Sequence, residues 1–109
     1  MQDYPVELLQ RMLEVYSPSG SESELAKVLC EEMRSNGMKS KIDPAGNVVG
    51  TLGSEGIRIL LCGHMDTVPG RIPVRVEDDF LYGRGSVDAK ASLAAMIIGA
   101  TLGMKRSTL

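Results

Sequence analysis

The residues best suited to chemistry begin at His64, the single histidine of a 109-residue chain, which precedes Asp66 by two positions. Side chains at positions i and i+2 of an extended chain project to the same side, so His64 and Asp66 are expected to point into one cleft. A metal-bound imidazole needs a carboxylate or carbonyl on its other nitrogen to fix its tautomer, and Asp66 suits that role. A structural histidine at the end of a strand is the alternative, and the His-x-Asp triplet alone favours it.

A second carboxylate, Asp88, lies where the glycine-rich turn Gly83-Arg84-Gly85 meets the start of a helix. It suits two roles, a metal ligand or a helix N-cap, and the two roles could coexist. Cys62 alternates onto the same side as His64 and Asp66, so it is either a further ligand or a small core thiol, and the thiol interpretation is favoured. The spacing therefore offers a small metal-binding cluster as one hypothesis.

Three segments together resemble one enzyme family. Gly63-His64-Met65-Asp66-Thr67-Val68-Pro69 is followed by Gly83-Arg84-Gly85-Ser86-Val87-Asp88-Ala89-Lys90, and Ser17-Pro18-Ser19-Gly20-Ser21-Glu22 precedes both. The combination resembles the zinc amidohydrolase and metallopeptidase family of acetylornithine deacetylase, succinyl-diaminopimelate desuccinylase and the aminoacylases, and the likeness covers almost the whole chain. Within that family, Val68-Pro69-Gly70, Ile72-Pro73-Val74 and Leu81–Lys90 are most similar to hydrolases that release lysine or ornithine from an amino-group carrier protein.

The resemblance implies a metal-dependent amidohydrolase that acts on C–N bonds other than peptide bonds. It implies that His64 and Asp88 are metal ligands, with Asp88 bridging the two Zn²⁺ or Co²⁺ ions of a complete site, and that Asp66 has a catalytic role behind His64. Two neighbouring metal ions need an anionic bridge, which a carboxylate can provide. The implied substrates are small N-acyl amino acids, such as N-acetyl-ornithine or N-acetyl-lysine, or a loaded carrier protein of lysine or arginine biosynthesis.

Part of the family's site has no counterpart in residues 1–109. The family's paired glutamates, which include its general base, its later acidic ligand, its closing histidine and its association domain all fall beyond this sequence. We therefore expect residues 1–109 to form a partial, amino-terminal catalytic domain that is inactive by itself. The alternative is a non-catalytic protein, either a split subunit completed by another chain or a degenerate metal-binding remnant.

The elements that must position these residues alternate between helical and extended patterns. Apolar residues recur at helical spacing after Asp3, a candidate cap, and again after the capping-box pair Ser21 and Glu24, until Asn36-Gly37 supplies a stop. A dense apolar run then predicts a buried strand that ends just before His64. The predicted extended segments are Met38–Ile42, Asn47–Leu52, Ile57–Cys62, Val74–Glu77 and Phe80–Tyr82.

A long helix is predicted from Lys90 to Leu102, where Ala, Leu, Met and Ile cover nearly all sides. One sheet face cannot bury so much of a helix, so we expect self-association or a complementing chain. The order of elements predicts an α/β fold. Together with the resemblance, it implies the amino-terminal part of a mixed-sheet, helix-flanked catalytic domain like that of the zinc exopeptidases.

Composition and charge restrict the classes of partner that the chain could bind. With 43% hydrophobic and 24% charged residues, the chain is in the globular range, and its length predicts one domain at most. A net charge of −2 without a run of like charges predicts neither a nucleic-acid nor a membrane partner. Cys30 and Cys62 are expected to be buried thiols, and the lack of a signal-like or membrane-spanning stretch predicts a cytoplasmic protein.

Overall fold

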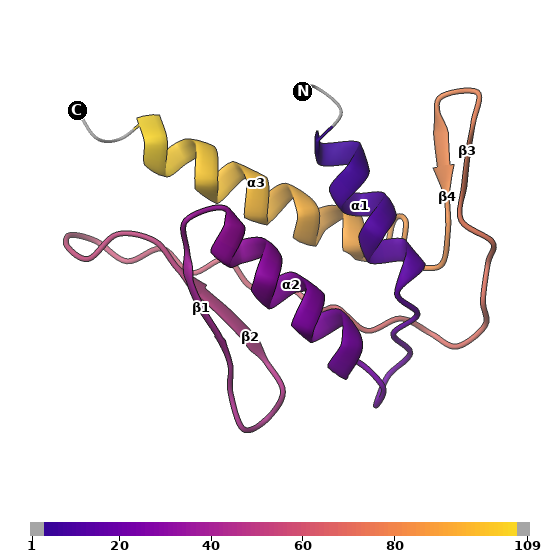
Figure 1. Cartoon of the computed structure of the whole chain (residues 1–109), viewed down its shortest axis with the longest axis horizontal. Helices are drawn as coiled ribbons and strands as arrows, with labels where there is room; N and C mark the ends of the chain where they lie inside the picture. The colour runs from indigo at the N-terminus through magenta and orange to yellow at the C-terminus, as the bar shows by residue number, and fades with distance from the viewer. Residues whose placement is uncertain (1–3, 107–109) are drawn as a thin grey trace.

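The computed structural model describes residues 4–106, which form three helices and two antiparallel β-hairpins. Figure 1 shows α1 lying across the first half of α3, with α2 between these helices and the first hairpin. The α/β class is confirmed, and the candidate cap Asp3 lies outside the described residues. The elements are α1 (Tyr4–Glu14), α2 (Ser23–Ser35), β1 (Lys39–Ile42), β2 (Val48–Thr51), β3 (Arg75–Glu77), β4 (Phe80–Tyr82) and α3 (Lys90–Arg106).

The core lies where the three helices meet. Because α1 and α2 carry their apolar residues at helical spacing, each buries one face and leaves most of its charged residues outside. The buried cluster consists of Leu8, Met12, Leu25, Leu29, Met38, Ala94 and Ile97. A polar group also joins α1 to α2, since Glu32 pairs with Arg11 at 2.9 Å and accepts a hydrogen bond from the hydroxyl of Tyr4.

The ends of α2 show one failed and one confirmed prediction. The predicted capping box does not form, because α2 starts at Ser23 and the capping position, Glu22, makes no side-chain hydrogen bond to the helix. At the other end, Asn36-Gly37 ends the helix as predicted, with Gly37 in the left-handed region at φ 89°. The chain then enters the predicted β1–β2 hairpin, which pairs Lys39 with Thr51.

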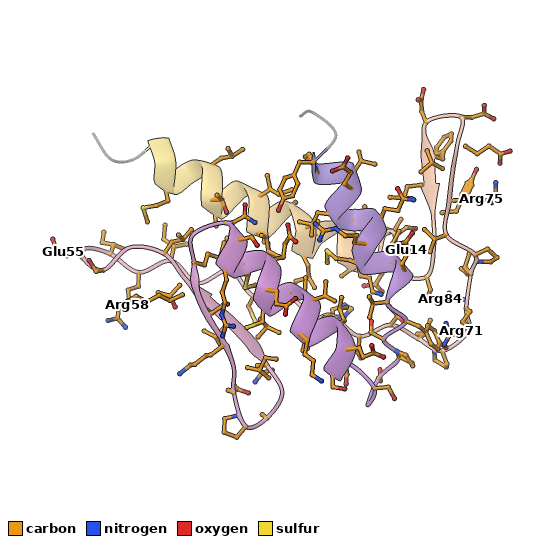
Figure 2. The ribbon with its side chains drawn as sticks, viewed as in Figure 1. Glu14, Glu55, Arg58, Arg71, Arg75 and Arg84 are labelled. Atoms are coloured by element: carbon orange, nitrogen blue, oxygen red, sulfur yellow. The ribbon has the colours of Figure 1, made fainter. Side chains whose placement is uncertain are left out.

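The largest correction concerns Ile57–Cys62, which was predicted as a buried strand. It forms no strand, and Ile57, Ile59 and Leu60 are 94%, 83% and 85% exposed. Figure 2 shows the neighbouring side chains of Glu55 and Arg58 extending away from the helices. A strand needs a neighbour for its backbone N–H and C=O groups, and among residues 4–106 the two hairpins are separate sheets that supply none here. The expected mixed sheet is therefore absent from the described residues.

The last part of the chain matches its predictions more closely. The predicted extended segments Val74–Glu77 and Phe80–Tyr82 contain β3 and β4, which pair as a second hairpin, and α3 begins at Lys90 as predicted but runs on past Leu102. α3 buries one line of side chains, whereas Leu102 on another side remains 51% exposed. That buried line consists of Lys90, Ala94, Ile97 and Thr101. Within residues 4–106, no helix is long and apolar enough to cross a membrane.

Candidate metal-binding site

The segment that carries His64 is fastened to the loop between α1 and α2. The backbone N–H of Thr67 donates to the Ser17 carbonyl at 2.9 Å, and that of Ser19 donates to the Thr67 carbonyl at 3.1 Å. The buried hydroxyl of Ser17 adds a bond of 2.9 Å to the Met65 carbonyl. These bonds form a short parallel bridge, so the loop holds residues 65–67 without a continuous sheet.

Glycines allow the other segments to approach closely. A Cβ at Gly63 would lie 3.0 Å from a terminal methyl of Leu93, so the lack of a side chain at position 63 lets the segment before His64 pass closely over α3. Gly85, with φ 96°, would carry its Cβ only 2.9 Å from Thr67. Within the predicted glycine-rich turn, position 85 must therefore be glycine, both for its backbone conformation and for its packing against Thr67.

Lys90 ties the start of α3 to the end of α1. Its Nζ donates to the carbonyls of Met12 and Val15, each at 2.9 Å, and its backbone N–H donates to the Gly85 carbonyl at 3.0 Å. The side chain is only 1% exposed, and this burial lowers its pKa to about 8. Because Asp88 is two residues away, this anchor also fixes where Asp88 can lie.

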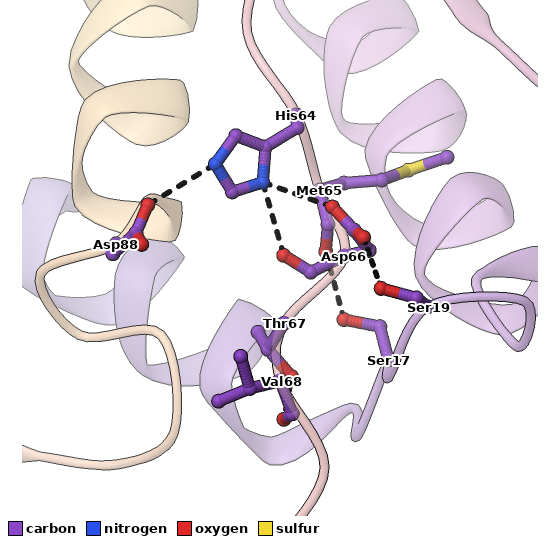
Figure 3. A network of polar contacts seen from close by, with 8 residues as sticks. All are labelled: Ser17, Ser19, His64, Met65, Asp66, Thr67, Val68 and Asp88. Carbon is purple, nitrogen blue, oxygen red and sulfur yellow. Dashed lines mark hydrogen bonds and ion pairs between the residues drawn. The ribbon is translucent and has the colours of Figure 1, made fainter.

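His64 lies between two carboxylates, as Figure 3 shows. Its Nδ1 is 2.9 Å from Asp66 Oδ1 and 3.1 Å from the Asp66 backbone oxygen, while Nε2 is 3.1 Å from Asp88 Oδ1. The expectation that His64 and Asp66 project together is confirmed. Asp88 makes its described side-chain contact with His64 rather than with a backbone N–H of α3, so the structure shows no helix cap there.

These contacts shift the pKa values of His64 and Asp66. The backbone oxygen of Asp66, followed by the Asp88 and Asp66 carboxylates, raises the pKa of His64. The hydroxyl of Ser19 donates to Asp66 Oδ2, and this bond, with a smaller contribution from His64, lowers the pKa of Asp66. The side chains of His64, Asp66 and Asp88 are 53%, 32% and 85% exposed, so the cluster is open to solvent. They line a cavity of about 430 Å³ that an incoming group can enter.

The donor atoms suit one divalent metal ion. Two ligand atoms that bind one tetrahedral zinc ion at about 2.0–2.2 Å are separated by about 3.4 Å, close to the 3.1 Å between His64 Nε2 and Asp88 Oδ1. The set is incomplete, because no group of three His, Cys, Asp or Glu side chains in residues 4–106 is arranged to hold a metal ion.

Cys30 is buried as expected, but Cys62 is exposed, which corrects the prediction of two buried thiols.

Two residues of the site escaped the sequence analysis as functional candidates. The sequence places Ser19 in a loop and Lys90 in a motif without indicating a role for either, whereas the structure shows Ser19 bonded to Asp66 and Lys90 anchoring the start of α3. Ser19 and Asp66 are 47 residues apart, so no local sequence pattern predicts their contact. A lysine on the buried line of an apolar helix was the one signal that could have indicated Lys90.

Several known proteins are similar to this chain. The model of the peptidase family M20/M25/M40 matches residues 60–104, which include His64, Asp66 and Asp88. A Pyrococcus abyssi protein named for LysW-lysine and LysW-ornithine hydrolysis is 52% identical over 87% of the chain. The LysW-lysine hydrolase of Deinococcus radiodurans is 48% identical over 84%, and the LysW-lysine/LysW-ornithine hydrolase of Saccharolobus islandicus is 44% identical over 88%.

The chain spans only about a quarter of the length of these relatives, since the aligned residues cover 28%, 25% and 27% of them, respectively. Within that span, the similarity extends beyond the two motifs, because the aligned segments are 95, 92 and 96 residues long. The family match and the extended identity agree with the resemblance seen in the sequence. The chain therefore belongs to the peptidase family M20/M25/M40.

Proposed function

We propose that this chain supplies one part of the metal site of a hydrolase that releases lysine or ornithine from an amino-group carrier protein. The observation that carries the proposal is the position of His64, with Asp66 at Nδ1 and Asp88 at Nε2, in a chain about half identical to LysW-lysine and LysW-ornithine hydrolases. Small N-acyl amino acids such as N-acetyl-ornithine are the second substrate class. Both substrates contain the amide bond to be cleaved.

Each residue of the cluster has a separate task in this proposal. His64 Nε2 and the Asp88 carboxylate would hold Zn²⁺ or Co²⁺, and the two oxygens of Asp88 would allow it to bridge a second ion. A bound divalent ion polarises the amide carbonyl as a Lewis acid. Asp66 Oδ1 would accept a hydrogen bond from Nδ1–H of His64, which would leave the Nε2 lone pair free for the metal. The exposure of Asp88 leaves room for further ligands.

The remaining ligands and the general base would come from polypeptide outside these 109 residues, so residues 1–109 act as a partial catalytic domain. We propose that the chain is inactive alone, because a single imidazole and two carboxylates leave most of a two-metal coordination shell to water. The second candidate is a split subunit completed by another chain. The apolar segment Ile57–Leu61 is exposed, as expected in either candidate of a surface that further polypeptide covers.

A chimaera tests the proposed function. The aligned segment of the Deinococcus radiodurans LysW-lysine hydrolase would be replaced by that of this chain, and release of lysine from the loaded carrier protein would be measured. We expect the chimaera to be active and to lose activity in His64→Ala and Asp88→Asn. Asp78→Asn, at the exposed β3–β4 turn, is the matched control and should retain activity. A folded chimaera without activity, or an active one that is indifferent to His64→Ala, would contradict the proposal.

A further inference from the structure

The loop Ser17–Glu22 is the sequence motif that the metal ligands do not explain. It approaches the site through Ser19, whose hydroxyl donates a hydrogen bond to Asp66 Oδ2. Figure 3 shows Ser19 on the far side of Asp66 from His64. The contact thus extends the line of bonded groups to four residues, from Ser19 through Asp66 and His64 to Asp88.

We propose that Ser19 is a positioning residue that fixes the orientation of His64 by holding the carboxylate of Asp66. Ser19 engages Oδ2, so Oδ1 is left to face His64 Nδ1 at 2.9 Å. A carboxylate held at both oxygens cannot rotate without breaking a bond, whereas one held at a single oxygen can. The inference concerns the ligand arrangement of the proposed function and rests on it for its biological meaning.

The position of Ser19 itself is fixed by its backbone. Its N–H donates to the Thr67 carbonyl, and the buried Ser17 hydroxyl holds the Met65 carbonyl next to the same segment. These bonds do not involve the Ser19 hydroxyl. The Ser19 side chain is exposed, and its described hydrogen bond is the one to Asp66. Removing the hydroxyl should therefore change the orientation of Asp66 while the loop stays in place.

The neutral form of His64 reports this orientation through its tautomer. Nδ1 faces two acceptors, Asp66 Oδ1 and the Asp66 backbone oxygen, whereas Nε2 faces one oxygen of the highly exposed Asp88. The Nδ1–H tautomer is therefore favoured, and it is the form that presents the Nε2 lone pair to a metal. A freely rotating Asp66 would weaken that preference.

Nitrogen-15 NMR of the 109-residue chain tests the inference. Because the chain has a single histidine, its imidazole signals need no further assignment. At a pH where His64 is neutral, we expect mainly Nδ1–H in the wild type and a shift toward Nε2–H in Ser19→Ala. Ser19→Thr keeps a hydroxyl and should restore the wild-type tautomer. The matched control is Ser21→Ala, since the exposed Ser21 side chain has no described hydrogen bond.

Zinc affinity provides the second readout. Loss of an outer-shell partner of a metal ligand typically costs about 10 to 100-fold, and Ser19 acts one bond farther out, so we expect a loss of about 3 to 10-fold in Ser19→Ala. An unchanged tautomer in a folded Ser19→Ala overturns the inference, as does an equal effect of Ser21→Ala or a collapse of the amide spectrum. A tautomer shift without zinc binding in the wild type supports the positioning role and contradicts the proposed function instead.

Discussion

Self-association of the isolated chain should depend on the exposed segment Ile57–Leu61. Ile57, Ile59, Leu60 and Leu61 are 94%, 83%, 85% and 53% exposed, which together equals about three fully exposed aliphatic side chains. Burying each is worth about 1.5–3 kcal/mol, so two copies that cover one another would gain roughly 9–18 kcal/mol. Association costs of about 4–15 kcal/mol offset much of this gain and leave at most about 14 kcal/mol; a surplus of about 4–8 kcal/mol, inside that range, corresponds to dissociation constants between about 1 mM and 1 µM.

The double variant Ile59→Lys/Leu61→Lys tests this estimate, because both positions are on one side of the extended segment and are already open to solvent. Sedimentation velocity from about 10 to 300 µM should show concentration-dependent association of the wild type and a monomeric variant. Val76→Lys changes a 56% exposed valine in β3 and is the matched control, which should associate like the wild type. A wild-type monomer throughout, with cooperative unfolding and no binding of a hydrophobic dye, would refute the reasoning.

Three further predictions concern the site. In steady-state assays with metal and N-acetyl-ornithine, the isolated chain should show no turnover above that of His64→Ala. Measurable excess turnover would refute the proposal that its metal site is incomplete. NMR titration should place the pKa of His64 above 6.5, and Asp88→Asn should lower it; an unchanged pKa would remove Asp88 from contact. Because the pKa of Lys90 falls from 10.5 to about 8, the unfolded chain holds a proton between these pH values that the folded chain has lost. The free energy of unfolding should therefore rise with pH there, by up to about 3 kcal/mol, and Lys90→Met should remove the rise in urea titrations.

The sequence predicts the local parts of this molecule and misses those that depend on distant neighbours. The pairing of His64 with Asp66 follows from extended geometry over two residues, and the helix stop at Asn36-Gly37 follows from glycine's freedom at positive φ. Ile57–Cys62 has the composition of a buried strand, but a strand exists only where another strand accepts its backbone bonds.

The contacts that complete the candidate site are equally non-local. Lys90 reaches carbonyls 78 and 75 residues earlier in the chain, and its hydrogen bonds satisfy two acceptors at the end of α1. No periodicity in the sequence encodes such a contact, because it depends on how α1 and α3 cross. Family resemblance identified the position of Asp88, whereas only the three-dimensional structure showed its carboxylate facing His64.

Zinc calorimetry on the 109-residue chain tests the central claim, that His64 and Asp88 hold a divalent metal ion. Complete structural zinc sites bind with about 10–16 kcal/mol, so roughly half a ligand set should give about 5–8 kcal/mol, or dissociation constants from about 1 µM to several hundred µM. We expect His64→Ala and Asp88→Asn each to weaken binding by about tenfold or more, and Asp78→Asn to leave it unchanged. Zinc binding that is the same in all four proteins would show that the metal lies elsewhere and would contradict the account.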